Sequence, residues 1–229
     1  MTVLAVLATF VIFLTIDYVR SRKRGVAPVV AREQAPVPVS RVQPAFVGGF
    51  ELPENLSYHP GHTWALAESP TLVRVGLDAF AARLIGLVGV TGKIEGFTLP
   101  KRGQWIRQGQ KIVTVQRDGS KAELVSPIEG EVSNVNDAVL ADNALPGRDP
   151  YGDGWLLTVM APDAKVSFRN LLNGTLARRW MEDAANRLRM RMPALAGAVA
   201  QDGGVVVDDV AAHLPDQAWS ELTREFFLM

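Results

Sequence analysis

Residues 112–132, "IVTVQRDGSKAELVSPIEGEV", decide the fold that this sequence predicts. Two runs of β-forming residues flank the pair Asp118-Gly119. An Asp-Gly pair favours a two-residue type I′ turn, because both central residues of that turn need a positive φ. The stretch therefore predicts an antiparallel hairpin with Asp118-Gly119 at its tip. Lys121 follows two residues after Gly119, on the returning strand.

Similar short strand-like runs surround this hairpin between about residue 56 and residue 160, and turn-forming residues separate them. Residues 78–86 differ, because their apolar side chains have helical spacing and Asp78 stands at the N-cap position. Many short strands with few helices predict a mainly β domain, an antiparallel barrel or sandwich. The predicted strands are residues 71–77, 111–116, 122–127, 130–136 and 154–160.

The composition limits the chemistry that the chain can perform. Its 229 residues include 24 basic and 24 acidic side chains, so a formal charge of zero gives no overall attraction to nucleic acid, and no nucleic-acid partner is expected. There is no cysteine, which excludes disulfides, thiolate metal sites and cysteine nucleophiles. No metal site is expected from the three histidines, and no nucleophile has a plausible base. The protein is therefore predicted not to be an enzyme, with no catalytic residue.

The first 24 residues predict a single membrane-spanning anchor. "MTVLAVLATFVIFLTI" runs sixteen residues without a charge, and the apolar segment up to residue 19 suits the thickness of a bilayer. A cleaved signal peptide would carry its positive charges before this run, whereas here they follow it. The positive-inside rule then places the amino terminus outside and the rest of the chain in the cytoplasm, at the inner (cytoplasmic) membrane. The expected contacts with the membrane are Asp17, Tyr18, Arg20, Arg22, Lys23 and Arg24.

Residues 25–54 are predicted to form a proline-rich linker, because prolines stiffen the chain and no helical or strand period is present. Residues 173–229 form a predicted helical extension. In it, Thr175 is expected to cap a helix over 175–192 whose apolar stripe recurs every four residues. That stripe is Leu176, Trp180, Ala184 and Leu188.

Two features of the extension predict contacts outside its own helices. Basic side chains of the 175–192 helix either stay solvated while the helix packs on the domain, or meet anionic lipid and acidic partners. The aromatic tail is too apolar for a solvated segment, so it packs on its own domain or on a partner; the sequence leaves both open. The residues concerned are Arg178, Arg179, Arg187, Arg189, Arg191, Trp219, Phe226 and Phe227.

The order of motifs resembles the H protein of the glycine cleavage system, a relative of lipoyl-carrier domains. The stretches that carry the resemblance are "YHPGHTWAL" (58–66), "LPKRGQWIRQGQ" (99–110), "SPIEGEVSNVNDAVL" (126–140) and "DPYGDGW" (149–155). The resemblance implies an H-protein-like antiparallel barrel-sandwich hybrid over residues 55–172. It also implies a function that depends on one lipoylated lysine at the hairpin tip.

The position of that lysine is taken by glycine when the motifs are matched from either side. Counting ten residues on from Gly109 gives Gly119, and counting eight residues back from Pro127 gives Gly119 again. Matching "DGSKA" instead would make Lys121 the lipoylated residue, but it requires two residues to be deleted from the returning strand. We therefore expect no cofactor, lipoate included, and a solvated lysine at position 121.

These observations together predict a non-catalytic accessory or scaffold subunit of a membrane protein complex, with bioenergetic assemblies among the candidate hosts. Its expected partners are membrane lipid and other membrane-protein subunits. One alternative is a membrane-tethered lipoyl carrier that works through Lys121. Another is a recruiter that binds a soluble lipoate-dependent enzyme by imitating its carrier.

Overall fold

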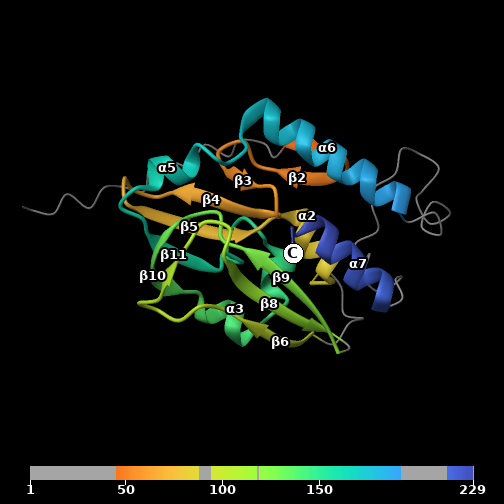
Figure 1. Ribbon diagram of the computed structural model, residues 1–229, viewed down its shortest axis with the longest axis horizontal. Coiled ribbons are helices and arrows are strands. Elements are labelled where there is room, and N and C mark those ends of the chain that lie inside the picture. Colours follow the sequence, from red (N-terminus) through yellow and green to blue (C-terminus); the bar gives the residue numbers. More distant parts are fainter. Residues whose placement is uncertain (1–44, 88–93, 118, 192–215, 229) are drawn as a thin grey trace, which may run out of the picture. The chain divides into compact units, whose positions relative to one another are not determined.

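Antiparallel strands dominate the computed structural model, which describes residues 45–87, 94–117, 119–191 and 216–228. The strands pair in three sheets within these residues, and helices lie around them (Figure 1). A mainly β fold with antiparallel sheets and few helices is thereby confirmed. The strands are β1 (Ala45–Val47), β2 (Phe50–Leu52), β3 (Ser57–His59), β4 (Thr63–Ala67), β5 (Leu72–Leu77), β6 (Ile94–Thr98), β7 (Trp105–Ile106), β8 (Lys111–Arg117), β9 (Ser120–Val125), β10 (Gly130–Val135) and β11 (Leu157–Met160).

The largest sheet has the order β3-β4-β5-β11-β10-β7, and a second has the order β6-β8-β9. Strand β11 therefore lies beside β5 although about 80 residues separate them along the chain. Strands β8 and β9 form the hairpin that was predicted around Asp118-Gly119. The last strand was predicted from residue 154 but begins at Leu157, because the amide of Gly154 is already bound to the Asp149 carbonyl oxygen in the preceding loop (2.9 Å).

Residues 45–52 correct the end of the predicted linker. They form the β1–β2 hairpin, in which Val47 pairs with Phe50 around Gly48 and Gly49, both at positive φ. Phe50 and Leu52 are buried in the core. After this Gly-Gly turn, buried Phe50 and Leu52 alternate with Glu51, and burying this face of the hairpin outweighs the proline-rich composition that precedes it.

Helix α2 (Ala79–Ile85) has the caps that its sequence predicts. The Asp78 carboxylate accepts a hydrogen bond from the Ala81 amide (2.8 Å), which satisfies one donor of the first turn. Gly86 ends the helix at a φ of +84°, the left-handed conformation that glycine adopts most easily. The other helices are α3 (Asp137–Ala141), α4 (Leu145–Arg148), α5 (Ala164–Phe168), α6 (Gly174–Arg191) and α7 (Asp216–Phe226).

Helix α6 begins one residue earlier than predicted, at Gly174 rather than after a Thr175 cap. The carbonyl oxygen of Asn173 accepts the first hydrogen bonds of the helix, from the amides of Leu176 and Ala177. Asn173 therefore stands at the N-terminal boundary of α6.

The buried face of α6 also differs from the predicted stripe. Leu176 is 63% exposed, whereas Ala177, Met181, Ala184 and Leu188 are buried. Steps of four residues advance about 40° beyond a full turn, so the predicted stripe winds around the helix. Alternating steps of four and three keep the observed residues on one side.

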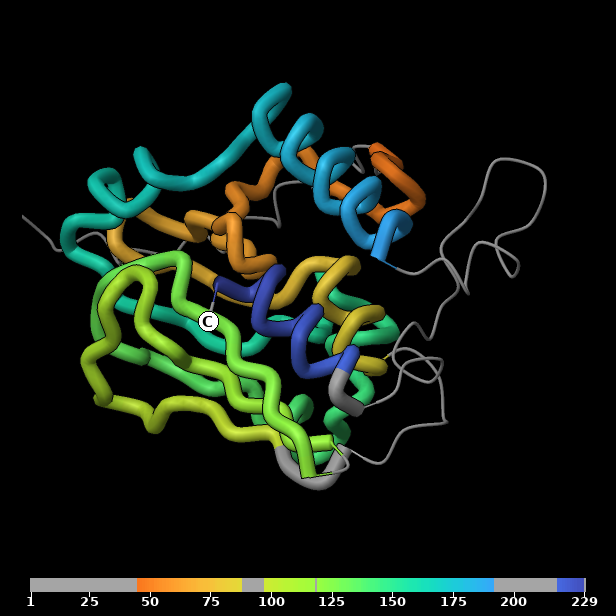
Figure 2. The backbone as a smooth tube through the Cα atoms, turned by 45° about the vertical axis from the view of Figure 1, so that its right-hand side comes forward, coloured from red at the N-terminus to blue at the C-terminus, as the bar shows by residue number. Residues whose placement is uncertain are grey.

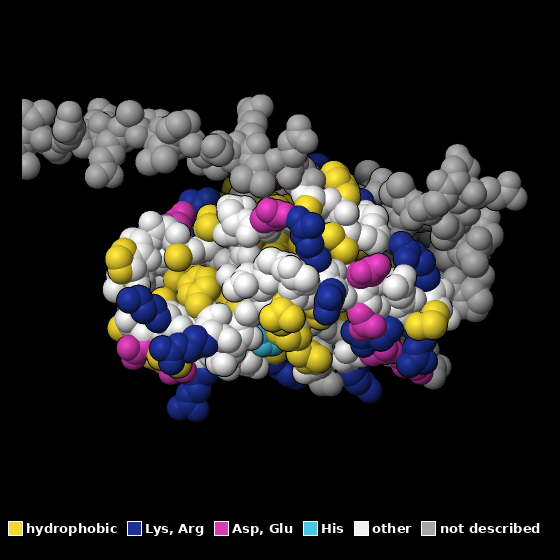
Figure 3. Space-filling view, turned by 90° about the horizontal axis from the view of Figure 1, so that it is seen from above, with side chains coloured by type: hydrophobic (Ala, Val, Ile, Leu, Met, Phe, Trp, Pro, Cys, Tyr) yellow, Lys and Arg dark blue, Asp and Glu magenta, His cyan; other side chains and the backbone are white. Residues whose placement is uncertain are grey.

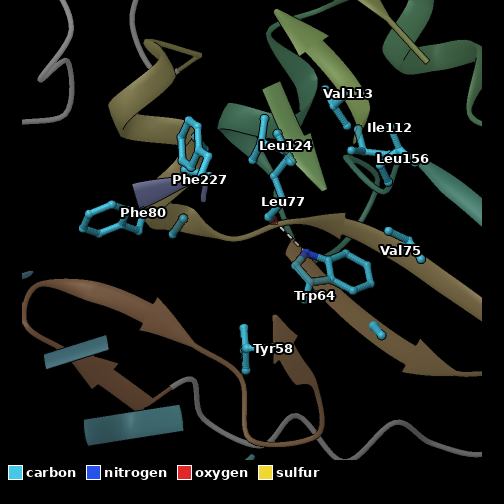
Figure 4. Packing of buried hydrophobic residues seen from close by; sticks show 14 of the residues in the cluster. Tyr58, Trp64, Val75, Leu77, Phe80, Ile112, Val113, Leu124, Leu156 and Phe227 are labelled. Atoms are coloured by element: carbon cyan, nitrogen blue, oxygen red, sulfur yellow. Dashed lines mark hydrogen bonds between the residues drawn. The ribbon is translucent and has the colours of Figure 1, made fainter. Parts of the chain in front are cut away.

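One hydrophobic core joins the sheets to α2, α6 and α7. Figure 4 shows side chains from several strands converging in it, including Trp64, Leu77 and Leu124, with Phe80 and Phe227 beside them. The predicted anchor (1–24) lies outside the described residues. None of the helices within the described ranges combines the length and apolarity needed to cross a membrane.

Candidate functional site

The strands of the hairpin pair in the register that the sequence predicts. Arg117 pairs with Ser120, and Gln116 pairs with Lys121, so two residues connect the strands and Gly119 is the second of them. Gly119 has a φ of +76° and is exposed, and a Cβ atom there would meet nothing within 4 Å. Asp118 itself lies outside the described residues. The backbone at position 119 thus favours glycine, while space for a longer side chain is available.

Lys121 lies on β9, after the turn and not in it. Its side chain is exposed, and its neighbour Ala122 points into the core. The side chains of β9 alternate between the two faces of the strand, as expected for a half-buried strand. Lys121 therefore projects from the side of the hairpin and not from its tip.

A second polar feature is a buried pair at the start of β4 and α2. Nδ1 of His62 lies 2.8 Å from Oδ2 of Asp78, and both residues are at most 1% exposed. His62 has a left-handed backbone (φ +62°), which is uncommon for a residue with a side chain. Its Nε2 atom is buried and has no hydrogen-bond partner among the described residues.

Aromatic rings enclose the His62 imidazole. Phe80 stacks on it with ring centroids 4.1 Å apart, and Trp180 of α6 lies at 4.6 Å. Phe226 and Phe227 present their edges at 6.1 and 6.3 Å. The imidazole is therefore closed in by residues from α2, α6 and the carboxy-terminal segment.

Helix α7 packs along β9 and lies beside α2, and both backbone views show this arrangement (Figures 1 and 2). The indole Nε1 of Trp219 donates a hydrogen bond to the Leu84 carbonyl oxygen (2.8 Å). Trp219, Phe226 and Phe227 are 3%, 2% and 0% exposed. Of the two possibilities that the sequence left open, the structure has the tail packed on its own domain. A partner contact through these three side chains would require α7 to leave the domain.

The arginines of α6 contact acidic side chains and carbonyl groups of the same chain. Arg178 pairs with Glu54, and Arg189 donates to the Gly48 carbonyl oxygen (2.9 Å). Arg187 and Arg191 lie 3.8 and 3.1 Å from the Glu225 carboxylate of α7. Arg179 is exposed. Figure 3 shows basic and acidic side chains interspersed on the face seen from above Figure 1, an arrangement that favours a helix packed on the domain with a solvated polar face.

Burial and nearby charges shift several pKa values in the direction that keeps the group neutral. Burial raises the pKa of Tyr151 well above its ordinary value, and its hydroxyl donates to the Glu51 carbonyl oxygen (2.6 Å). Burial, and then His62, lowers the pKa of His59. The Nδ1 atom of neutral His59 accepts a hydrogen bond from the Gly61 amide (3.0 Å). These groups serve packing and hydrogen bonding.

The "DPYGDGW" loop is held by hydrogen bonds of the kind that turns use. The Asp149 carboxylate accepts the amides of Gly152 (3.0 Å) and Asp153 (2.7 Å). Asn136 of the neighbouring strand end donates to the carbonyl oxygens of Asp153 (2.8 Å) and Trp155 (2.7 Å). In the described ranges, no three histidine or acidic side chains come together in a geometry that could hold a metal ion.

Comparison with known proteins supplies the family. The model of the family described as "Glycine cleavage H-protein" matches residues 56–184. The chain belongs to the glycine cleavage H-protein family. The H protein of Gloeobacter violaceus is 36% identical over 113 residues, 49% of this chain and 82% of that protein. The H protein of Coxiella burnetii is 33% identical over 116 residues, 50% of this chain and 84% of that protein.

A solved H-protein structure from Mycobacterium marinum is 29% identical and covers 48% of this chain and 86% of that chain, with a TM-score of 0.41. The family match contains the hairpin, the His62–Asp78 pair and the first part of α6. Helix α7 lies beyond its end at residue 184. This H-protein domain therefore carries an additional helix that is packed against it.

The contact residues predicted at the membrane boundary lie outside the described residues: Asp17, Tyr18, Arg20, Arg22, Lys23 and Arg24. Sequence reasoning also missed the contact between His62 and Asp78. In the antiparallel pairing of β4 with β5, Thr63 lies opposite Leu77, which brings the adjacent residues His62 and Asp78 together. The sequence does not specify this strand register, and so the contact was not predicted.

Proposed function

We propose that this protein is a non-catalytic accessory subunit that uses an unlipoylated H-protein domain as a rigid scaffold in a membrane complex. The observation that carries the proposal is the hairpin tip. Gly119 occupies the position where the family resemblance places the lipoylated lysine, and the register of β8 with β9 puts this glycine in the turn itself. A glycine offers no amine for the amide bond to lipoate.

The membrane part of the proposal rests on the amino-terminal sequence. An uncharged run of sixteen residues followed by four basic side chains is typical of a retained single-span anchor with its basic flank in the cytoplasm. The anchor and the linker would hold the H-protein domain near the membrane, where other subunits and lipid are its partners. Bioenergetic assemblies are candidate hosts.

The intact mass of the protein, purified from its own membranes in mild detergent with whatever accompanies it, tests this proposal. We expect an unmodified mass and membrane partners in a fixed ratio. A mass gain equal to a lipoyl group would overturn the proposal that the domain is unlipoylated. An unmodified protein that purifies alone would overturn the scaffold role.

A gain-of-modification experiment sharpens the same test. Gly119→Lys places an amine at the tip, where the open space around the Cβ position allows it. In a lipoylation reaction with a lipoate-attaching enzyme and labelled lipoate, we expect the variant to take the label and the wild type to remain unlabelled. Lys121→Arg in the variant background is the matched control, and it should leave the label in place.

A second candidate function is a membrane-tethered lipoyl carrier that uses Lys121. The exposure of this side chain, near the tip, favours it. A lipoyl group located on Lys121 by peptide mass analysis would establish this function in place of the first. Recruitment of a soluble lipoate-dependent enzyme is the remaining alternative, and it would give a stable complex with such an enzyme without a membrane partner.

A further inference from the structure

Helix α7 covers a surface of the H-protein domain, which we call the α7 seat. The seat consists of β9 together with Gly61, His62, Phe80, Leu84, Arg187 and Arg191. Phe226 lies 4.9 Å from Phe80 between ring centroids, and Trp219 bonds to the Leu84 carbonyl oxygen. The Phe227 carbonyl oxygen lies only 3.3 Å from where a Cβ of Gly61 would stand. The helix therefore fits closely against this surface.

The buried side chains of α7 and of Phe227, which follows it, have the spacing of an amphipathic helix that packs into a hydrophobic groove. Their positions follow the pattern i, i+3, i+4, i+7 and i+8, which places them in one stripe along the helix. Amphipathic helices that bind in a hydrophobic groove of a partner protein use side chains with this spacing as their anchors. The residues in the stripe are Trp219, Leu222, Thr223, Phe226 and Phe227, each at most 5% exposed.

The contacts that hold α7 are of a kind that can be exchanged. No strand pairing joins it to a sheet in the described residues, and its backbone hydrogen bonds there are internal to the segment. The ion pairs of Glu225 with Arg187 and Arg191 involve partly exposed side chains, and such pairs contribute little. Between α6 and α7 stand 24 residues (192–215), so leaving the seat does not require α6 to unfold.

The seat also contains a polar atom that α7 leaves without a partner. Nε2 of His62 is buried under the aromatic rings and has no hydrogen bond within the described part of the chain. Removal of Phe226 and Phe227 would open the region beside this imidazole. Access of water to Nε2 would then supply the missing hydrogen bond, which lowers the net advantage of the closed arrangement.

We propose that the α7 seat is a helix-docking site and that α7 is its internal, displaceable occupant. The partner that it fits is an amphipathic helix with the same aromatic stripe and a carboxylate at the position of Glu225, facing Arg187 and Arg191. This inference rests on the proposed scaffold function, because it supplies the surface on which a partner subunit would bind. The preference for a carboxylate follows from the two guanidinium groups that border the seat; because these side chains are partly exposed, it is secondary to the aromatic stripe.

A labelled peptide of residues 214–229 serves as the probe, titrated onto the full chain in mild detergent and followed by fluorescence anisotropy. Trp219→Ala with Phe226→Ala weakens the internal occupant, and we expect this chain to bind the peptide at least about tenfold more tightly than the wild type. Leu228→Ala, at a side chain that is 56% exposed, is the control and should bind as the wild type does. A peptide with both substitutions should not bind.

Equal affinity of the double variant and the wild type would overturn the proposal, as would equal binding of the substituted peptide. Glu225→Lys is a second variant that leaves the aromatic stripe intact, and it should raise peptide affinity by a smaller, salt-sensitive factor. In the wild-type chain, hydrogen exchange provides an independent readout. The amides of α7 should exchange while those of β5 and β10 stay protected; simultaneous exchange of all of them would contradict displacement.

Two further outcomes distinguish this inference from a homodimer and from the proposed function. A concentration-dependent dimer that disappears in the double variant would assign the seat to α7 of a second copy and overturn the assignment to a partner. A lipoyl group found by intact mass would overturn the proposed function, yet it would leave the peptide exchange unaffected. Failure of exchange with an unmodified mass would overturn only the docking site.

Discussion

His62 and Asp78 meet in the core at 2.8 Å, although 16 positions separate them in the sequence. The contact arises because β4 pairs with β5, with Thr63 opposite Leu77. The Asp78 carboxylate serves two groups, since Oδ1 accepts the Ala81 amide at the start of α2 and Oδ2 faces the imidazole. One side chain thereby fixes the helix start and the orientation of a buried histidine.

Asp78→Ala should destabilise the domain by about 2–4 kcal/mol, because it removes a helix cap and leaves a buried imidazole nitrogen unpaired. Asp78→Asn keeps an oxygen for the cap and should lose clearly less. Urea unfolding of both variants beside the wild type measures the difference. If Asp78→Ala and Asp78→Asn unfold at the wild-type midpoint, the pair has no structural importance.

Acidification should weaken the fold through His59. Burial and His62 lower the pKa of this side chain in the folded protein below its ordinary value of 6.5, so the unfolded chain takes up a proton more readily. Stability is then present above the unfolded pKa and is lost as the pH falls through about 6.5 toward the folded pKa. Protonation of Nδ1 would also remove the acceptor for the Gly61 amide.

The measurement for His59 is the urea midpoint at about pH 7.5 and about pH 5.5. His59→Asn keeps a short side chain that can accept a backbone amide two residues on, without titrating in this range. We expect a smaller fall in midpoint for this variant than for the wild type. The same fall in both proteins would assign the pH dependence to other groups.

Substitution at the hairpin tip tests its backbone. Gly119→Val should cost about 1–2 kcal/mol, because a β-branched residue is strained at a φ of +76°. Gly119→Asn should cost less, since asparagine adopts the left-handed region more readily. A Cβ at this position has nothing within 4 Å, so steric contact is excluded as the cause. Thermal unfolding of the two variants beside the wild type measures these costs. Equal stability of Gly119→Val and Gly119→Asn would argue against a left-handed backbone at this position.

Asn136 should be sensitive even to replacement by aspartate. Its Nδ2 donates to two carbonyl oxygens of the 149–155 loop, and its Oδ1 accepts the Ala138 amide at the start of α3 (3.1 Å). Asn136→Asp keeps the cap but turns two hydrogen bonds into repulsions, so we expect a loss of about 2–4 kcal/mol. Asn134→Asp is the control in urea unfolding: Asn134 is partly exposed, and aspartate keeps the oxygen that accepts from Arg102, so we expect a stability within about 1 kcal/mol of the wild type.

The local parts of the fold could be predicted from the sequence where a short stretch contains its own cause. Asp118-Gly119 specified a turn, Asp78 specified a helix start, and Gly86 its end, because turn and cap preferences act within a few residues. The buried face of α6 could also have been predicted, since alternating four- and three-residue spacing was present. The β1–β2 hairpin was missed because the boundary was drawn from composition.

The sequence by itself therefore determined strands β5 and β8 to β11, the hairpin with its glycine tip, and the resemblance that identifies the family. Tertiary structure alone decided that His62 reaches Asp78 and that α7 returns to cover the imidazole. Such contacts depend on strand register and on which apolar surface a distant helix meets. Amphipathic spacing shows that a helix has a face to bury but leaves its partner unspecified, because the hydrophobic effect has no direction.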